Sequence, residues 1–379
     1  MTEQLTSQPT TVLGRIARVE ARSVAVPLPV PARLSRRLLD VRHYTFARVT
    51  DEDGTVGIGF CLGGTPVADF VRFLAPKLIG REIVETERLW DELYYETILI
   101  GRRGAGLRAL SMIDIALWDL RGKLVGVPLA HLLGVYQDPV PAYASGGYFV
   151  QGEGLAELDD EVTRWAQDGY SAIKVKVGGV SLEEDVERLR TIRSAIGGHI
   201  RLMLDANNAW RDVPAALRAI RRFEEFDIEW IEEPLSPDDV DGHRRLAEML
   251  DTTVATGEIE ATRWGFAPIF RARAADVIQV DAAVCGGISE WLKIAHTACT
   301  FDVPVAPHWF SDLHVHCVAS IPNGIWVEHF TNTRILNVME LFERSLEVRG
   351  GFAAVPKEPG LGIALKESAL DRYALGPWS

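Results

Sequence analysis

The chain has 379 residues, of which 47% are hydrophobic and 25% charged, so it can bury a sizeable core and does not have the composition of a disordered chain. Its net charge of -13 argues against a general nucleic-acid binder, which needs a basic surface. The same charge disfavours long-range attraction of an anionic substrate. A site for an anion must therefore be cationic locally or carry a metal ion.

The cysteines and the hydropathy of the chain indicate the cellular compartment in which the protein is expected. The four cysteines, Cys61, Cys285, Cys299 and Cys317, form no CxxC pair, so neither a zinc ribbon nor a redox motif is indicated. The polar start of the chain lacks the features of a secretory signal. No stretch approaches the roughly 18 apolar residues of a membrane span. We expect a soluble, cytoplasmic protein with reduced thiols.

The first third of the chain is interpreted as a flexible tail at 1–14 and a small α+β module at 15–135. Strand-like runs at 16–27, 44–50 and 55–61 come first, and the acidic turn Asp51–Gly54 between the second and third predicts a hairpin. Leucine and isoleucine then recur at helical spacing over 107–124, and Gly126 and Pro128 end this helix.

From about residue 139 the pattern changes to short apolar runs separated by helix-like stretches such as 182–196 and 213–226. The runs are 140–143, 172–177, 201–204, 229–231, 253–255, 277–280, 303–306 and 325–327. This alternation is typical of a (β/α) barrel, which we place at 136–345. The last segment, 346–379, is expected to return to the N-terminal module.

Charged residues stand at the ends of these runs. Asp205, Glu232 and Glu258 end or follow the third, fourth and fifth runs, 27 and 26 residues apart. The carboxyl ends of barrel strands meet at one mouth, so the three carboxylates are expected to converge there. Without a cysteine they favour a hard cation, above all Mg²⁺, which would relieve their mutual repulsion. Any one of them alone could instead cap a helix or pair with a lysine.

Other polar residues share this mouth. Lys174 and Lys176 in the second run face the same side of their strand, where two lysines are rare unless they are used. Asp281 follows the sixth run and His308 the seventh, and a carboxylate orients an imidazole and tunes its proton affinity. His314 and His316 form a His-x-His pair that could bind a metal, but we favour packing or oligomer contacts, since the nearby acidic triad already makes a metal site.

In order and spacing these motifs resemble the mandelate racemase subgroup of the enolase superfamily over nearly the whole chain. The matching pieces are Lys174-Val175-Lys176, Asp205-Ala206-Asn207, Glu232-Glu233-Pro234, Gly257-Glu258, Asp281, His308 and Glu328. The resemblance implies a modified (β/α)7β TIM-type barrel with an α+β capping domain formed by both termini. Ile259 stands where racemase-like members often carry Asn, which weighs against mandelate racemisation itself.

The resemblance also implies roles for individual residues. Lys176 would be the base, and Lys174 would contact the substrate carboxylate and depress its neighbour's pKa. Glu328 would hydrogen-bond that carboxylate, which requires a protonated side chain; a surface ion pair with Arg334 or His329 is the alternative. Asn207 would support the metal or the substrate, although a turn residue is equally compatible.

The chemistry implied is Mg²⁺-dependent removal of a proton beside a carboxylate, giving an enediolate. We favour dehydration of a sugar acid to a 2-keto-3-deoxy acid, because dehydratases dominate the subgroup members with Lys-x-Lys and a His-Asp pair. Lys176 and His308 would flank the substrate carbon from opposite faces. Arg33, Arg36 and Arg37 are expected in a mobile loop that closes over the substrate, with Arg36 binding it.

Several alternatives stay open. A racemase, an epimerase or a lactone cycloisomerase would use the same chemistry. An ordinary barrel aldolase would form a Schiff base on Lys174 or Lys176 and would be insensitive to EDTA. A non-catalytic barrel would bind acid sugars without exchanging their protons. The expected partner is a small-molecule carboxylate, with no nucleic acid and no membrane, and a homo-oligomer is expected.

Overall fold

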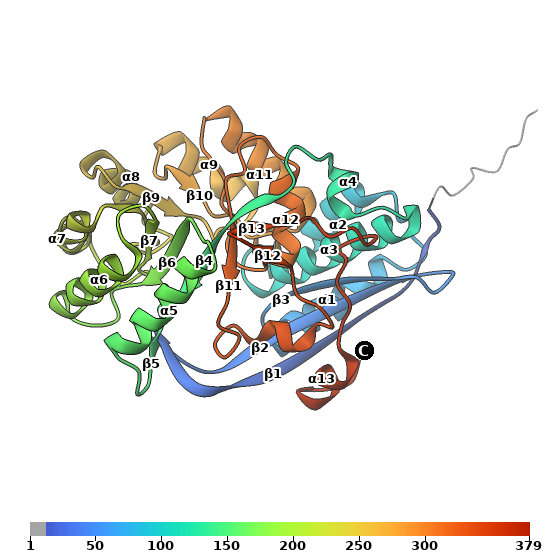
Figure 1. The fold of residues 1–379 in the computed structure, drawn as a ribbon. Coiled ribbons are helices and arrows are strands. Elements are labelled where there is room, and N and C mark those ends of the chain that lie inside the picture. Colours follow the sequence, from blue (N-terminus) through green and yellow to red (C-terminus); the bar gives the residue numbers. More distant parts are fainter. Residues whose placement is uncertain (1–12) are drawn as a thin grey trace, which may run out of the picture.

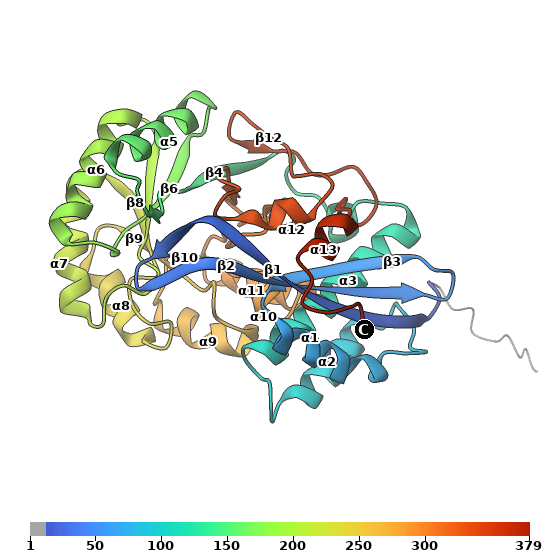
Figure 2. The same ribbon diagram turned by 90° about the horizontal axis from the view of Figure 1, so that it is seen from below.

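A computed structural model describes residues 13–379, so the predicted tail lies outside the described residues except for its last two positions. The chain forms a barrel and a cap whose long strands run alongside it (Figure 1). Seen after a 90° turn, the cap strands cross the middle of the molecule and reach towards the barrel helices (Figure 2).

The cap is an antiparallel sheet covered by helices. Its strands, in the spatial order β3-β2-β1-β5, are β1 (Ile16–Leu34), β2 (Arg37–Asp51), β3 (Val56–Leu62) and β5 (Phe149–Val150). Its helices are α1 (Thr65–Leu74), η1 (Ala75–Lys77), α2 (Thr86–Thr97), α3 (Ala105–Val125) and α4 (Leu129–Leu133). The helix predicted over 107–124 is α3, which ends at Gly126 in the left-handed region.

The predicted acidic hairpin joins β2 to β3. Asp51 Oδ1 accepts hydrogen bonds from the backbone N–H groups of Asp53 (3.1 Å) and Thr55 (2.7 Å), which fixes the turn.

The prediction for the first strand was too short. β1 does not end at Pro27: its pairing with β2 shifts register between Pro27 and Ala32 and then resumes up to Leu34. The prolines in between lack an N–H group and suggested the end of a strand, yet a register shift accommodates them. The segment expected to be a mobile loop is therefore the tip of a long hairpin, turning at Ser35 (φ 44°).

The barrel strands are parallel neighbours in chain order. They are β4 (Val140–Gly146), β6 (Ala172–Lys176), β7 (Arg201–Asp205), β8 (Ile228–Glu232), β9 (Thr253–Thr256), β10 (Val277–Ile278) and β11 (Val327–Phe330), and β11 pairs with β4. The outer helices are α5 (Leu155–Gln167), α6 (Leu182–Ile196), α7 (Val213–Phe223) with η2 (Glu224–Phe226), α8 (Val240–Met249), α9 (Thr262–Ala272), α10 (Ala282–Cys285), α11 (Ile288–Thr300) and α12 (Ser311–Ala319). This is the expected (β/α)7β arrangement.

The seventh strand is weaker than predicted. Over 303–306 only Val305 makes bridge contacts, to Ile278 on one side and to Gly324 on the other. Pro304 has no N–H to donate to a ladder, so a regular strand cannot form there. The bridges still carry the barrel wall from β10 towards β11.

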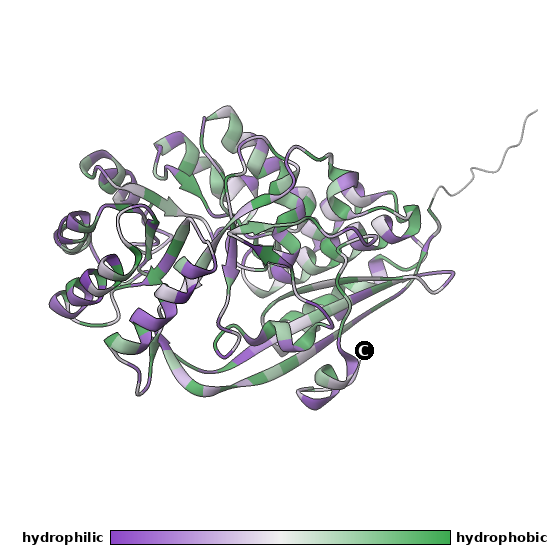
Figure 3. Ribbon diagram, in the orientation of Figure 1, coloured by the Kyte–Doolittle hydropathy of each residue, from purple (hydrophilic) through white to green (hydrophobic). Residues whose placement is uncertain are grey.

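Side-chain alternation divides the barrel into an apolar base and a charged mouth. On β6, Ile173 and Val175 pack outwards under the helices. Ala172 faces inwards with other buried side chains from the neighbouring strands, which are Tyr143, Met203, Trp230, Ala255, Val277 and Ala306. Because side chains alternate along a strand, Lys174 and Lys176 follow Ala172 on the inner face. The outer helices show mixed hydrophilic and hydrophobic colouring, as amphipathic elements do (Figure 3).

The C-terminal segment contacts the barrel before the cap. β12 (Val348–Arg349) and β13 (Phe352–Ala353) form a small hairpin, and β13 pairs with β4. η3 (Asn337–Leu341) precedes this hairpin, and after it the chain reaches the cap strands through α13 (Glu367–Arg372). The backbone N–H of Ala25 donates to the Tyr373 carbonyl at 2.9 Å, so β1 holds this segment.

Two expectations about the surface can be set against the described residues. None of the helices at 13–379 is long and apolar enough to cross a membrane. The four cysteines are free thiols, with only Cys299 exposed.

Close packing of β3 on α3 requires glycine. A Cβ added to Gly59 would lie 1.9 Å from the carbonyl oxygen of Met112, inside the helix backbone. We expect Gly59→Ala to lower the free energy of unfolding by about 2 kcal/mol or more, since backbone cannot move aside cheaply. Chemical denaturation would measure it. Gly198→Ala, where a Cβ would meet nothing within 4 Å, is the control and should change it by less than about 0.5 kcal/mol. Equal effects would contradict the packing.

Candidate active site

A row of charged residues crosses the carboxyl ends of three adjacent strands. Lys176 of β6 is in register with Asp205 of β7, which is in register with Glu232 of β8. All three are buried, with exposures of 5%, 1% and 0%. Strand register alone therefore places a cation beside two carboxylates at the barrel mouth.

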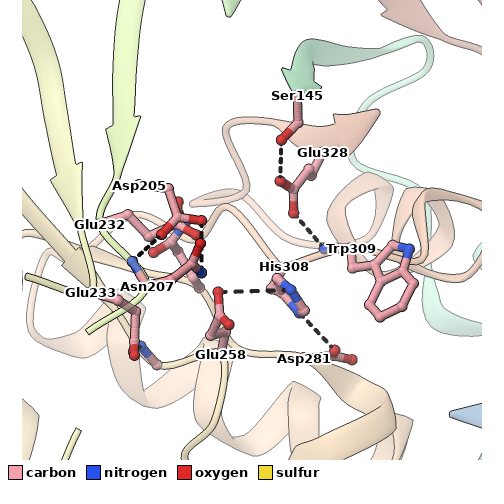
Figure 4. Close-up of polar contacts among 12 residues, drawn as sticks. Ser145, Asp205, Asn207, Glu232, Glu233, Glu258, Asp281, His308, Trp309 and Glu328 are labelled. Carbon is pink, nitrogen blue, oxygen red and sulfur yellow. Dashed lines mark hydrogen bonds and ion pairs between the residues drawn. The ribbon is translucent and has the colours of Figure 1, made fainter. Parts of the chain in front are cut away.

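Glu258 adds a third carboxylate to the row. It follows β9 after Gly257, whose φ of +123° is strained for any side chain other than glycine's hydrogen. Carboxylate oxygens of Asp205, Glu232 and Glu258 lie within 4.8 Å of one another (Figure 4). The structure thus brings together the three residues predicted as metal ligands.

The two lysines neutralise part of this charge. Lys176 Nζ lies 2.5 Å from Asp205 Oδ2. Lys174 Nζ lies 2.6 Å from Glu232 Oε2 and 2.8 Å from Glu328 Oε1, and its side chain is fully buried. Burial lowers the pKa of Lys176, but the Asp205 carboxylate outweighs it and holds the pKa above its ordinary value.

His308 stands at the other end of the row. Its Nδ1 lies 3.0 Å from Asp281 Oδ2 and its Nε2 lies 3.7 Å from Glu258 Oε2. Burial lowers the pKa of His308, but the Glu258 and Asp281 carboxylates outweigh it and raise the pKa to about 9. The imidazole is therefore a cation at neutral pH in this arrangement.

The expectation for Glu328 changes. Its carboxylate accepts hydrogen bonds from Ser145 Oγ and from the Trp309 backbone N–H, both at 2.7 Å (Figure 4). Burial raises its pKa, but the positive charges of Lys174 and His308 prevail and lower it to about 2. Glu328 is thus ionised, whereas the expected electrophilic role needs a protonated carboxyl. The alternative partner Arg334 binds Glu153 instead.

Neighbouring amides hold two of the three acidic residues in place. Asn207 donates from its backbone N–H to Asp205 Oδ1 at 2.8 Å and from Nδ2 to Oδ2 at 3.2 Å, in a left-handed turn with φ of 42°. Gln279 Nε2 donates to Glu232. Burial and Glu258 raise the pKa of Glu233 to about 7, and this residue accepts a hydrogen bond from Thr256 Oγ1 at 2.7 Å. Asn207 therefore both forms the turn and supports a carboxylate.

The donor set fits a divalent, oxygen-binding cation. Burial and the neighbouring acids, first Asp205, raise the pKa of Glu232 well above its ordinary value. Glu258 Oε2 is buried with no hydrogen-bond partner. The ion pairs at this end of the barrel join five carboxyl groups, from Asp205, Glu232, Glu258, Asp281 and Glu328, to three cations, Lys174, Lys176 and His308. A charge of +2 would balance the difference, and carboxylate oxygens are the ligands that Mg²⁺ prefers.

The site opens into a cavity of about 200 Å³ between the barrel and the cap. Lys176, Asn207, Glu258 and His308 form its floor, and the roof includes Leu34, Arg37, Arg42, Leu62 and Arg108. Lys174 and Glu328 do not line it, because they lie beneath the row. The expected contact between Lys174 and the substrate stays a prediction, since Lys174 reaches the cavity only through the carboxylates above it.

The hairpin tip does cover the cavity, but the predicted arginine is not the one that faces it. Arg36 Nη2 donates to the Ala209 carbonyl at 2.7 Å and is not part of the lining. Arg33 lies over the Phe149 ring and borders a separate cavity. Arg36 is thus turned away from the cavity, whereas Arg37, which belongs to the predicted segment, and Arg42 line it.

The His-x-His pair packs inside the protein. His314 Nε2 accepts from the Ala282 N–H at 3.0 Å, and His316 Nδ1 accepts from the Ala130 N–H at 3.2 Å. Both rings are fully buried, and burial lowers the pKa of each, that of His316 to about 4. Of the two roles considered, packing is the one that the structure shows.

Other residues at the site were not predicted. Arg42, Arg108, Tyr148 and Gln279 carry no local motif. The two arginines reach the mouth from the cap, Tyr148 follows β4, and Gln279 follows β10. One signal was present: Gln279 is a polar residue in the predicted sixth strand, on the run that leads to Asp281.

Comparisons with known proteins place the chain. Residues 16–134 match the mandelate racemase / muconate lactonizing enzyme N-terminal domain, and residues 157–369 match the enolase C-terminal domain-like family. An arabinonate dehydratase of Saccharolobus solfataricus is 37% identical over 336 residues, covering 86% of this chain and 89% of that protein. An L-talarate/galactarate dehydratase of Salmonella typhimurium is 37% identical over 327 residues, 85% and 80% of the two chains.

A solved structure of a relative is also similar to this chain. The L-talarate dehydratase of Polaromonas sp. JS666, complexed with Mg and L-glucarate, has a TM-score of 0.88 and 35% identity over 96% of this chain and 98% of that one. Cycloisomerases are also among the relatives. Both family models together cover most of the chain, and its fold and acidic site are those that the resemblance implied. The chain belongs to the mandelate racemase / muconate lactonizing enzyme family of the enolase superfamily.

Proposed function

We propose that this protein is a Mg²⁺-dependent acid-sugar dehydratase that forms a 2-keto-3-deoxy acid. One observation carries the proposal: Lys176 and His308 lie at opposite ends of the carboxylate row and line the same cavity. A substrate held over the row would present one side to a lysine and the other to a histidine. The acid-sugar dehydratases among the relatives support this choice.

Asp205, Glu232 and Glu258 would hold the ion. When bound, Mg²⁺ supplies positive charge beside the substrate carboxylate and so stabilises the charge that develops when the α-proton leaves. Asn207 and Gln279 keep two of the carboxylates in position through their hydrogen bonds.

Lys176 is the proposed base. It must be neutral to take a proton, and burial already lowers its pKa. The Asp205 carboxylate opposes this effect only while its own charge is uncompensated. The positive charge of Lys174 also lowers the pKa of Lys176, and both effects gain weight when a bound cation compensates Asp205.

His308 is the proposed acid. With a pKa of about 9 it carries a proton at neutral pH, and Asp281 holds its ring. When the Cβ–O bond breaks, the hydroxyl takes this proton and leaves as water. The resulting enol rearranges to the keto acid, and one water is lost overall.

A lactone cycloisomerase is the second candidate. The two cycloisomerase relatives align over 95% of this chain, more than the two dehydratases do. The products distinguish the reactions, because cycloisomerisation leaves the mass of the substrate unchanged and dehydration removes a water. A mass spectrum of the product decides between them.

We also propose that the protein works in the cytoplasm as a homo-oligomer. Four free thiols support a reducing compartment. The exposed side chains of Tyr95, Leu99 and Ile100 supply apolar surface that a second copy could cover.

The metal ligands can be tested one at a time. Asp205→Asn, Glu232→Gln and Glu258→Gln each remove a charge and should weaken Mg²⁺ binding by about 100-fold and nearly abolish turnover, since the remaining ligands cannot replace the lost charge. Titration calorimetry and a keto-acid assay would measure both. Glu229→Gln is the control, because Glu229 lies on the same strand as Glu232 but pairs with Arg201 outside the site. Full activity of EDTA-treated protein would overturn the metal assignment.

The two proton-transfer groups should give different defects. His308→Asn should still exchange the α-proton of the substrate with D₂O but form no keto acid, since Lys176 remains and the acid is gone. Lys176→Ala should lose both exchange and product. NMR of the substrate and the keto-acid assay would show this.

A swap of the two phenotypes would mean that the substrate binds by its other face, and it would still support the pair. His296→Asn, on the exposed side of α11, is the control. If both variants kept forming product, the pair would not be catalytic.

A further inference from the structure

The cavity roof carries positive charge that the proposed reaction at the floor does not use. Arg37 and Arg42 of β2 and Arg108 of α3 line the roof. Arg42 is 6% exposed, and its Nε donates to the Ile335 carbonyl at 2.9 Å. Arg108 Nη1 donates to the Leu62 carbonyl at 3.2 Å. Within residues 13–379 none of these three guanidinium groups has a carboxylate within 4.0 Å.

This lack of partners stands out in an acidic protein. The chain has 53 Asp and Glu residues against 40 Lys and Arg, and many exposed arginines do have carboxylate partners. A buried cation without a counter-ion is unfavourable, so a buried arginine at a cavity is normally paired by protein or by ligand. The acids that line the same cavity, Glu258 and Asp281, lie beside His308 at the floor and form no ion pair with these arginines, so a ligand in the cavity can supply their negative charge.

The guanidinium of Arg42 is also held in a fixed orientation. It lies 5.3 Å from the centroid of the Trp309 ring, and its Nη2 is buried without a hydrogen-bond partner. Planar guanidinium groups with unused donors match a carboxylate, which accepts two parallel hydrogen bonds. Trp309 follows His308 directly, so the roof and floor are linked through adjacent residues.

We propose that the substrate is a dicarboxylate sugar acid, an aldarate. One carboxylate lies at the acidic floor, and the second is bound by Arg42 and Arg108 at the roof, with Arg37 beside them. A cavity of about 200 Å³ lies between the floor and the roof. This inference rests on the proposed function and narrows it to one substrate class.

This substrate class can be tested with pairs of sugar acids that differ only at the carbon farthest from the reacting carboxylate. Galactarate and galactonate, like glucarate and gluconate, differ at C6, where the first has a carboxylate and the second a hydroxymethyl group. For a pair that is turned over, kcat/KM should be about 10- to 100-fold higher for the diacid, the effect of one or two hydrogen bonds to a charged group. A higher kcat/KM for the monoacid, or for 6-phosphogluconate, would overturn the proposal.

Variants locate the effect. Arg42→Met and Arg108→Met should lower kcat/KM for the diacid by about 10- to 100-fold and leave that for the monoacid within about threefold. Arg42→Lys keeps a charge in case Arg42→Met does not fold, and it should lose part of the preference. Arg18→Met, on the exposed part of β1, is the control and should change neither value. Equal losses for both acids would contradict a subsite for the second carboxylate.

A binding measurement separates this inference from the proposed function. Calorimetry with Mg²⁺-loaded protein should show galactarate or glucarate binding at least tenfold more tightly than the matched monoacid, and Arg42→Met should remove the difference. If no acid is turned over but this preference is found, the dehydratase proposal fails and the subsite stands. Equal affinities overturn the subsite, whatever the activity.

Discussion

The structure depends on an imbalance of buried charge at one end of the barrel. Five carboxyl groups and three cations meet there with almost no solvent, and Lys174, Lys176 and His308 cannot neutralise them all. Burying unpaired charge is unfavourable, so such a cluster is stable only if carboxyls take up protons or a cation binds. Burial and the neighbouring acids, first Asp205, raise the pKa of Glu232 in the direction of the first outcome, and a divalent ion would provide the second.

The scaffold holds the charged groups of this imbalance at fixed positions. In-register strands hold Lys176, Asp205 and Glu232 in a row, so their spacing is set by the hydrogen-bonded backbone and not by mobile loops. The cap contributes the opposite wall, where the hairpin of β1 and β2 reaches over the mouth and α3 supplies Arg108. The acidic floor and the basic roof thus come from different parts of the chain. A metal ion would balance the negative charge of the floor, and a carboxylate ligand would balance the positive charge of the roof.

The parts of the fold and the site that can be predicted from the sequence are those set by local contacts and regular spacing. Barrel strands alternate regularly with helices, so Lys176, Asp205, Glu232 and Glu258 could be placed at one mouth from their spacing alone. The roof could not, because Arg42 and Arg108 meet the site only through tertiary packing. Arg36 was chosen by its place in a basic run, yet hairpin geometry turns it towards Ala209. The ionisation of Glu328 depends on Lys174 and His308 and was likewise hidden.

Proton release on metal binding tests the charge imbalance most directly. Calorimetry of Mg²⁺ binding in buffers of different ionisation enthalpy counts the protons exchanged. Burial and the neighbouring carboxylates raise the pKa of Glu232, and a bound cation opposes that shift, so Mg²⁺ binding should release protons. Glu232→Gln, measured at saturating Mg²⁺, should release fewer. Binding at neutral pH without any proton release would contradict the account.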